Sequence, residues 1–178
     1  MSNYKINLKN VRLSFPSIFK KSEFNGVVGK YEATFLMDKD LQAKMIDELQ
    51  SKIAQIQKEN SKVSPDKICV KDGEFVEYDG YKNAISIKAG NNRRPTVINR
   101  DTSPLIEEDN IIYAGCYVNA SLELWFQDNS YGKRVNCNLL GIQFVKDGEN
   151  FGAGDVDVTS SFENLDLSQK GDDDDCGF

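Results

Sequence analysis

Residues 113–126 read YAGCYVNASLELWF, and residues 134–145 read RVNCNLLGIQFV. In the first stretch polar and apolar side chains alternate, so one set faces one way (Tyr117, Asn119, Ser121, Glu123, Trp125) and the other faces the core (Val118, Ala120, Leu122, Leu124, Phe126). This period of two predicts long, half-buried strands. Residues 127–132, QDNSYG, are rich in turn formers and predict the loop that joins them.

Further strands are predicted upstream of this pair. Residues 4–15 alternate, but the apolar positions slip by one residue between Leu8 and Val11, which indicates a bulge. Residues 30–37 alternate without a break, and residues 84–89 and 96–99 are shorter candidates. Between them, residues 38–60 predict a helix, with Asp38 or Asp40 as its N-cap. Its apolar residues recur at spacings of three and four: Leu41, Met45, Ile46, Leu49, Ile53 and Ile56.

Five or six strands with one helix between the early and the late strands predict a mainly β fold, an OB-fold-like Greek-key barrel with one capping α-helix at about 38–60. A jelly roll or a mixed α+β sheet would give a similar pattern. A chain of 178 residues suits one main domain. We expect it to span residues 1–154, followed by a flexible acidic C-terminal tail over residues 155–178.

The negative charge is concentrated in that tail. The chain carries 22 basic and 28 acidic residues, and eight of the acids but only one base, Lys170, lie from Asp155 onward. The rest of the chain is therefore nearly neutral and has room for a basic face. The tail ends in four acids and an aromatic ring, a pattern that favours a peptide hook for protein partners: Asp172, Asp173, Asp174, Asp175 and Phe178. The alternative is a plain solvated tail in which the final Phe178 is accidental.

Several functional classes are disfavoured. The chain has no histidine, which removes the commonest general base and most zinc sites. Its four cysteines are scattered without a Cys-x-x-Cys pair, so reduced thiols are expected and no metal or cofactor is predicted. No apolar run is long enough to cross a bilayer, and the N-terminus lacks a signal-peptide pattern. We therefore expect a cytoplasmic protein with no membrane partner.

Residues 78–101 combine tyrosines with cations, which is the combination that single-stranded nucleic acid requires: rings under the bases and positive charge along the backbone. Alternation places Lys88 on the open face of its strand, and the loop at 90–94 is expected to present two arginines at a hairpin tip. The predicted DNA-binding residues are Tyr81, Lys82, Lys88, Arg93, Arg94 and Arg100, with Trp125, Tyr131, Lys133 and Arg134 as extensions. A solvated basic loop beside two core tyrosines is the alternative.

Two other functions fit parts of the sequence. Asp101 and the acids 107–109 suggest a Mg²⁺-dependent nuclease, although adjacent loop residues point in different directions. A protein-interaction module without nucleic acid, in which only the tail works, is the third class. The sequence does not decide between a monomer and a homodimer.

The chain resembles a family of phage single-stranded DNA-binding proteins that was long known only as a domain of unknown function. The matching stretches are residues 10–16 (NVRLSFP), 79–82 (DGYK), 93–95 (RRP), 113–120 (YAGCYVNA), 141–146 (GIQFVK) and Gly148. The resemblance implies an OB-fold that coats and protects single-stranded DNA during phage DNA replication and recombination in the bacterial host, without base preference and without enzymatic activity. The tail is similar to those of replicative single-stranded DNA-binding proteins, which recruit replication or recombination proteins, but Gly177 stands where the bacterial version has proline.

Overall fold

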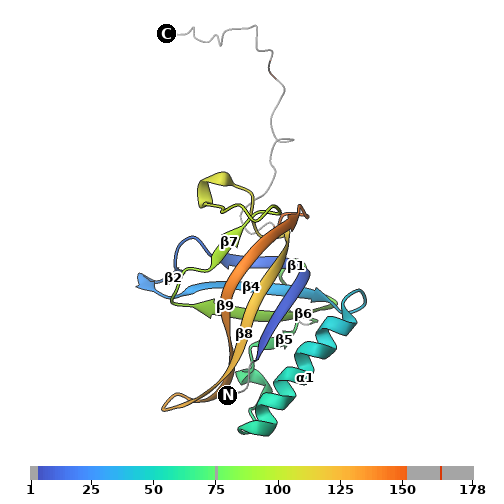
Figure 1. Cartoon of the computed structure of the whole chain (residues 1–178), viewed down its shortest axis with the longest axis vertical. Helices are drawn as coiled ribbons and strands as arrows, with labels where there is room; N and C mark the ends of the chain where they lie inside the picture. The colour runs from blue at the N-terminus through green and yellow to red at the C-terminus, as the bar shows by residue number, and fades with distance from the viewer. Residues whose placement is uncertain (1–3, 75, 152–164, 166–178) are drawn as a thin grey trace.

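The computed structural model describes residues 4–74, 76–151 and 165, so the predicted partner-binding residues Asp172 to Asp175 and Phe178 lie outside the described residues. Figure 1 shows the arrangement of the elements. They are β1 (Lys5–Ser17), β2 (Glu23–Phe24), β3 (Val27–Val28), β4 (Tyr31–Asp38), α1 (Ala43–Glu59), β5 (Val70–Asp72), β6 (Ala84–Asn91), β7 (Thr96–Ile98), β8 (Tyr117–Asn129) and β9 (Gly132–Lys146), with short 3₁₀ turns at Pro65–Lys67 and Glu107–Asp109.

Five strands form a closed ring. Strand β1 pairs antiparallel with β4 and β8, β4 pairs with β6, and β8 pairs with β9. The ring closes where β6 meets β9 in parallel, at Gly90 opposite Asn138. The order β1–β4–β6–β9–β8 is that of a five-stranded Greek-key barrel, and the predicted OB-fold is confirmed. Strands β5 and β7 lengthen the wall by pairing with β6 and β9.

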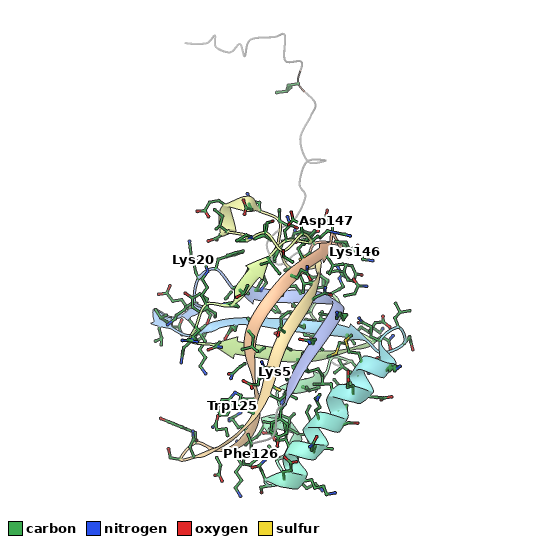
Figure 2. All side chains as sticks on the ribbon, viewed as in Figure 1. Lys5, Lys20, Trp125, Phe126, Lys146 and Asp147 are labelled. Atoms are coloured by element: carbon green, nitrogen blue, oxygen red, sulfur yellow. The ribbon has the colours of Figure 1, made fainter. Side chains whose placement is uncertain are left out.

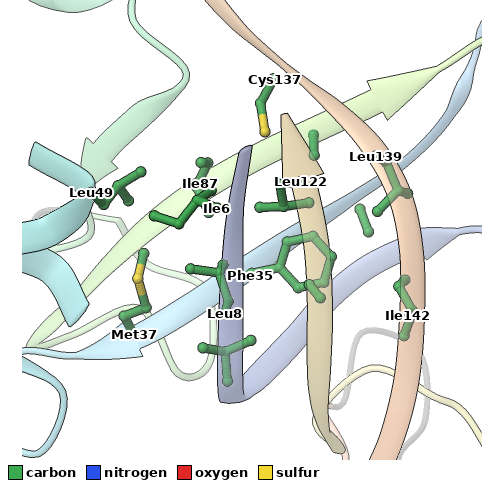
Figure 3. Close-up of a cluster of buried hydrophobic side chains, with 14 of the residues drawn as sticks. Ile6, Leu8, Phe35, Met37, Leu49, Ile87, Leu122, Cys137, Leu139 and Ile142 are labelled. Carbon is green, nitrogen blue, oxygen red and sulfur yellow. The ribbon is translucent and has the colours of Figure 1, made fainter. Parts of the chain in front are cut away.

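The barrel interior is filled by alternate residues from every strand of the ring. Phe35 of β4 is fully buried, and the side chains of Leu8, Leu122, Leu139 and Ile87 surround it in one cluster (Figure 3). Full burial of such a side chain stabilises the fold by roughly 1.5–3 kcal/mol. This shared interior fixes which side chains point outward, so it also fixes the composition of the outer face on which a ligand binds.

The helix is present but begins later than predicted. The carboxylate of Asp38 accepts hydrogen bonds from the backbone N–H groups of Asp40 and Leu41, so it organises a turn that precedes α1. Neither Asp38 nor Asp40 is the N-cap, because Gln42 occupies that position. Leu41 was predicted to belong to the apolar face of the helix, but it lies in this turn and is 87% exposed. The buried residues of the helix are Leu49, Ile53 and Ile56, as predicted.

The connections differ from the prediction in two places. Strand β8 continues to Asn129 and β9 begins at Gly132, so the predicted six-residue loop is a tight turn with Ser130 and Tyr131 at its tip. A second hairpin, β2–β3, was not predicted. The bulge expected between Leu8 and Val11 is confirmed by the register shift of β1 on β8. Within the described residues, no helix has both the length and the hydropathy that crossing a membrane requires.

Candidate nucleic-acid interface

A large groove lies across the outer face of β4 and β6. Its volume is about 1060 Å³. One end is bounded by the 76–81 segment and by Phe15, which lies at a second irregularity of β1, between Ser14 and Ser17. The other end is bounded by the outer face of the β8–β9 hairpin. The β2–β3 hairpin completes its walls, and the 66–71 segment contributes to its floor. The lining residues that the argument uses are Phe15, Phe24, Lys30, Glu32, Asp66, Lys67, Lys71, Tyr78, Tyr81, Lys88, Trp125 and Arg134.

The groove carries an excess of positive charge. Five of its lining residues are basic (Lys30, Lys67, Lys71, Lys88, Arg134), and two are acidic, Glu32 and Asp66. The Lys88 ammonium lies 3.7 Å from the Glu32 carboxylate. A hydrogen bond from the Ser64 hydroxyl lowers the pKa of Asp66, so this acid stays charged. The surplus of cations makes the groove attractive to a polyanion.

Three aromatic rings form a platform at one end of the groove. The Phe15 ring meets the Tyr78 ring edge-on with centroids 4.9 Å apart, and Tyr78 lies 5.7 Å from Tyr81. Phe15 is 48% exposed and Tyr78 60% exposed, whereas Tyr81 is buried. The hydroxyl groups of Tyr81 and Ser14 are 3.0 Å apart and hydrogen-bonded, which anchors the buried end of the platform to β1. The exposed rings are the flat, apolar surfaces on which unpaired bases stack.

The backbone under this platform is strained. Phe15 has φ +48°, a conformation that costs a bulky residue on the order of 1–2 kcal/mol. The register shift of β1 between Ser14 and Ser17 produces this conformation. Behind the platform Gly80, at φ +84°, lets the Phe151 ring approach so closely that a Cβ would lie 2.3 Å from it. A strained backbone that holds a half-exposed aromatic side chain is typical of a functional site.

The floor of the groove is the seam between β6 and β9. Away from the single bridge at Gly90, residues 67–70 fill this seam, because Cys69 donates its N–H to Val135 and accepts from the N–H of Lys88. Burial raises the pKa of the Cys69 thiol to about 12, and also raises the pKa of Cys137. Both thiols therefore stay protonated and are poor nucleophiles. The described cysteines, Cys69, Cys116 and Cys137, are free thiols.

The wall formed by β8 and β9 is polar and carries Trp125. Figure 2 shows Trp125 toward the hairpin end of β8, with Lys146 at the opposite end of β9. Asn136, directly opposite Trp125, donates to the side-chain oxygen of Gln127 at 2.7 Å. The Trp125 indole N–H is buried and has no hydrogen-bond acceptor among the described residues. A buried donor without an acceptor is unfavourable by about 1–3 kcal/mol.

Four of the ten residues predicted to bind DNA line the groove: Tyr81, Lys88, Trp125 and Arg134. Lys88 is exposed on β6, as the alternation predicts. Tyr81 is 6% exposed, so its ring supports the platform while Tyr78 and Phe15 present their faces. The predicted set is thus divided: the groove brings together Lys88, Trp125 and Arg134 of the barrel strands with Tyr81 of the segment before β6.

The remaining six do not line the groove. Arg93 and Arg94 are exposed in the loop between β6 and β7, which is not a hairpin tip because β7 pairs in parallel with β9. The Arg94 guanidinium lies 5.9 Å from the centre of the Phe19 ring, near the start of the β2–β3 segment. Arg100 donates to the carbonyl of Val145.

The other three are separated from one another. Lys82 lines a smaller recess of about 460 Å³ together with Arg12 and Tyr117. Tyr131 is 82% exposed at the tip of the β8–β9 turn. Lys133 donates to the hydroxyl of Ser61 at 3.3 Å.

Sequence reasoning missed several groove residues. Phe15 was assigned to a strand without a ligand role, and Phe24, Lys30, Lys67 and Lys71 were not singled out. One signal was available: Asn25-Gly26 between short β-formers is the strongest local sign of a hairpin. The positive φ of Phe15 follows from strand pairing across the barrel and has no local signature.

The carboxylates considered for a nuclease make other contacts. Asp101 accepts from the backbone N–H and the hydroxyl of Ser103, which lowers its pKa. Glu107 lies 3.6 Å from Lys20, and Asp109 accepts from the N–H of Ile106. Residues 4–74, 76–151 and 165 contain no group of three or more acids and cysteines arranged to hold a metal ion.

Comparison with known proteins gives consistent results. A family model described as Enterobacter phage Enc34, ssDNA-binding protein, matches residues 4–176. Putative protein p50 of Acyrthosiphon pisum secondary endosymbiont phage 1 is 37% identical over 179 residues, covering 93% of this chain and 96% of the relative. The single-stranded DNA-binding protein of bacteriophage Enc34, solved in complex with ssDNA, has a TM-score of 0.77 at 33% identity and covers 84% of this chain and 90% of its own.

A fourth likeness concerns the fold alone. The single-stranded DNA-binding protein gp2.5 of bacteriophage T7 has a TM-score of 0.54 at 14% identity, covering 95% of this chain and 100% of that chain.

Proposed function

The chain belongs to the family of the Enterobacter phage Enc34 ssDNA-binding protein, and from that membership we propose that it binds single-stranded DNA in the groove across β4 and β6. The observation that carries the proposal is the exposed Phe15–Tyr78 pair beside Lys88 in one groove. Bases stack on the rings while phosphates contact the cations, and neither interaction depends on base identity. The family consists of binding proteins, and no catalytic step is assigned to this groove.

The strand reaches three sides of the barrel in this proposal. It enters at the aromatic platform, crosses Lys88 on β6 and leaves along the β8–β9 wall past Trp125 and Arg134. In OB-folds, oligonucleotides bind on this same face, which is formed by the second and third strands of the barrel and the loops at its ends. In this chain those two strands are β4 and β6. The groove is open along its length, so a single strand can be bound anywhere along a longer molecule.

A titration of labelled oligo(dT) of ~30 nucleotides, followed by fluorescence anisotropy at two salt concentrations, tests the proposal, with a matched duplex as control. We expect saturable binding to the single strand that weakens with salt, and weaker binding to the duplex. The only tryptophan of the chain, Trp125, gives a second readout, because its emission should change as the strand binds. Absence of binding at low salt, also after deletion of residues 171–178, would refute the proposal.

We further propose that the acidic tail recruits replication or recombination proteins of the phage or its bacterial host, in whose cytoplasm the protein works. The four acids 172–175 and the terminal Phe178 form a short polyanion with an aromatic ring, which competes with DNA for a basic groove. Deletion of residues 171–178 should therefore tighten DNA binding, most visibly at low salt. Weaker or unchanged binding would refute the competition between the tail and DNA.

Light scattering of the full chain tests for a homodimer.

A further inference from the structure

The β2–β3 hairpin projects from the barrel as a short arm (Figure 1), and its Phe24 lines the groove. Its turn, Asn25-Gly26, has φ +52° and +79°, the positive values of the type I′ turns that match the twist of a hairpin. At its base Ser22 donates its N–H to the carbonyl of Lys30 and accepts from the N–H of Gly29. These bonds fix the direction of the arm, so each of its side chains has a defined face.

The two faces of the arm differ in what they present to the groove. Phe24 lies opposite Val27, and Glu23 lies opposite Val28. Directly opposed residues of an antiparallel pair share one face of the ribbon. Phe24 and Val27 therefore lie on one face of the arm, and Glu23 and Val28 lie on the other. Phe24 lines the groove, so its face is turned toward the ligand site. Val27 lies on the same face of the arm as Phe24.

The apolar side chains of the arm are unusually exposed. Phe24 is 79% exposed, Val27 69% and Val28 62%. A two-stranded ribbon gains little stability by itself in water, so such side chains contribute when they pack against something. Lys30 of the same segment lines the groove next to Phe24, and Lys21 at the base of the arm lies over the Tyr31 ring. An apolar face between cations is complementary to a polyanion that carries flat apolar bases.

We propose that the Phe24–Val27 face of the β2–β3 hairpin packs on the bases of the bound strand and acts as an apolar arm over the groove. This inference rests on the proposed function, because it needs DNA in the groove. It assigns a stacking role to Phe24 on the side wall of the groove, in addition to the Phe15–Tyr78 platform at one end. The bound strand is then contacted by aromatic side chains from two sides, while Lys30 and Lys88 contact its phosphates.

Three single variants test the arm: Phe24→Ala and Val27→Ser on the groove face, and Val28→Ser on the opposite face as a matched control. All three residues are mostly exposed, so unfolding temperatures should match that of the unchanged chain. Binding is measured by anisotropy with an oligonucleotide short enough to hold one protein molecule. We expect Phe24→Ala to weaken binding ~5-fold or more, the loss of one stacked base, and Val27→Ser to weaken it less. Val28→Ser should bind as the unchanged chain does.

The outcomes separate the two proposals. If the unchanged chain does not bind, the proposed function fails. If it binds and Phe24→Ala binds equally well, the arm does not contact the strand. An equal loss in all three variants would overturn the assignment of faces. A loss that appears only on long DNA holding several molecules would assign the arm to contacts between copies of the chain, and would overturn the inference as well.

Discussion

The Glu32 carboxylate of β4 lies 3.7 Å from the Lys88 ammonium of β6, in the middle of the basic groove. The Lys88 side chain is 65% exposed and that of Glu32 31%, so the pair is largely solvated and stabilises the fold by about 0–1 kcal/mol. Its larger effect concerns the ligand. Glu32 neutralises the cation that a phosphate would contact, and its own charge repels the strand.

Replacement of Glu32 by Gln should therefore strengthen DNA binding. The expected gain is roughly two- to fivefold at low salt, corresponding to the strength of an exposed ion pair, and it should shrink as salt is added. Anisotropy titrations at two salt concentrations measure it. Glu23→Gln, which removes the same charge from the β2–β3 hairpin face turned away from the groove, is the control. Weaker binding by Glu32→Gln would mean that the carboxylate contacts the bases directly.

Replacement of Phe15 by Asn should separate DNA binding from stability. Asn tolerates the left-handed backbone better than Phe, which relieves strain, but the T-shaped contact with Tyr78 is lost at a cost of about 0.5–1.5 kcal/mol. These effects oppose each other, so the free energy of unfolding should change by less than about 1 kcal/mol. Affinity for oligo(dT) should fall ~5-fold or more, because a stacking ring is removed.

Ile106→Asn is the control for this variant. Ile106 is 52% exposed and lies outside the groove, so its replacement should change neither quantity. Urea unfolding and anisotropy give the two numbers for each variant. A Phe15→Asn protein that binds normally would assign the platform to packing alone.

The buried thiol of Cys69 should make stability fall at alkaline pH. Its pKa is raised by burial from 9.0 to about 12, so the unfolded chain loses this proton at lower pH than the folded one. Stability is unaffected below pH 9 and is lost as the pH rises toward 12, by about 1.4 kcal/mol per pH unit at most. Urea unfolding at pH 8 to 11 measures the slope. In Cys69→Ser the slope should be shallower, and parallel curves for the two proteins would contradict the assignment.

The sequence predicts the barrel well because the alternation of polar and apolar residues within each strand is a local pattern. The alternation in residues 117–126 and the slip between Leu8 and Val11 reproduce β8 and the bulge of β1. The start of the helix was misplaced because Asp38 caps a turn before it, and a capping residue looks the same in both situations.

The groove was harder to predict because it is assembled from segments distant in the chain. Lys88 was placed on the open face from alternation, since the outward face of a strand can be derived from its period, whereas Trp125 and Arg134 were chosen as an aromatic residue and a cation near the end of a strand. Phe15 reaches the surface through a register shift against β4, and Lys67 and Lys71 reach the groove because residues 67–70 fill the seam between β6 and β9. Such placements depend on tertiary pairing, so composition favoured the local Arg93-Arg94 cluster instead.

The length of the DNA should distinguish the two groups of cations. Lys88 and Arg134 line the groove, whereas Arg93 and Arg94 lie in the loop after β6, beside Phe19. The double change Lys88→Ala with Arg134→Ala should weaken binding to both a short and a long oligonucleotide, of ~6 and ~30 nucleotides. Arg93→Ala with Arg94→Ala should weaken binding only to the long one, which extends past the groove.

Each lost phosphate contact should also reduce the slope of log K against log salt by about 0.7, because fewer counterions are released. Titrations at four salt concentrations give this slope for each protein and each length. The long strand should show a shallower slope for both double variants, and the short strand only for the groove pair. If Arg93→Ala with Arg94→Ala leaves the slope on long DNA unchanged, the strand does not pass that loop.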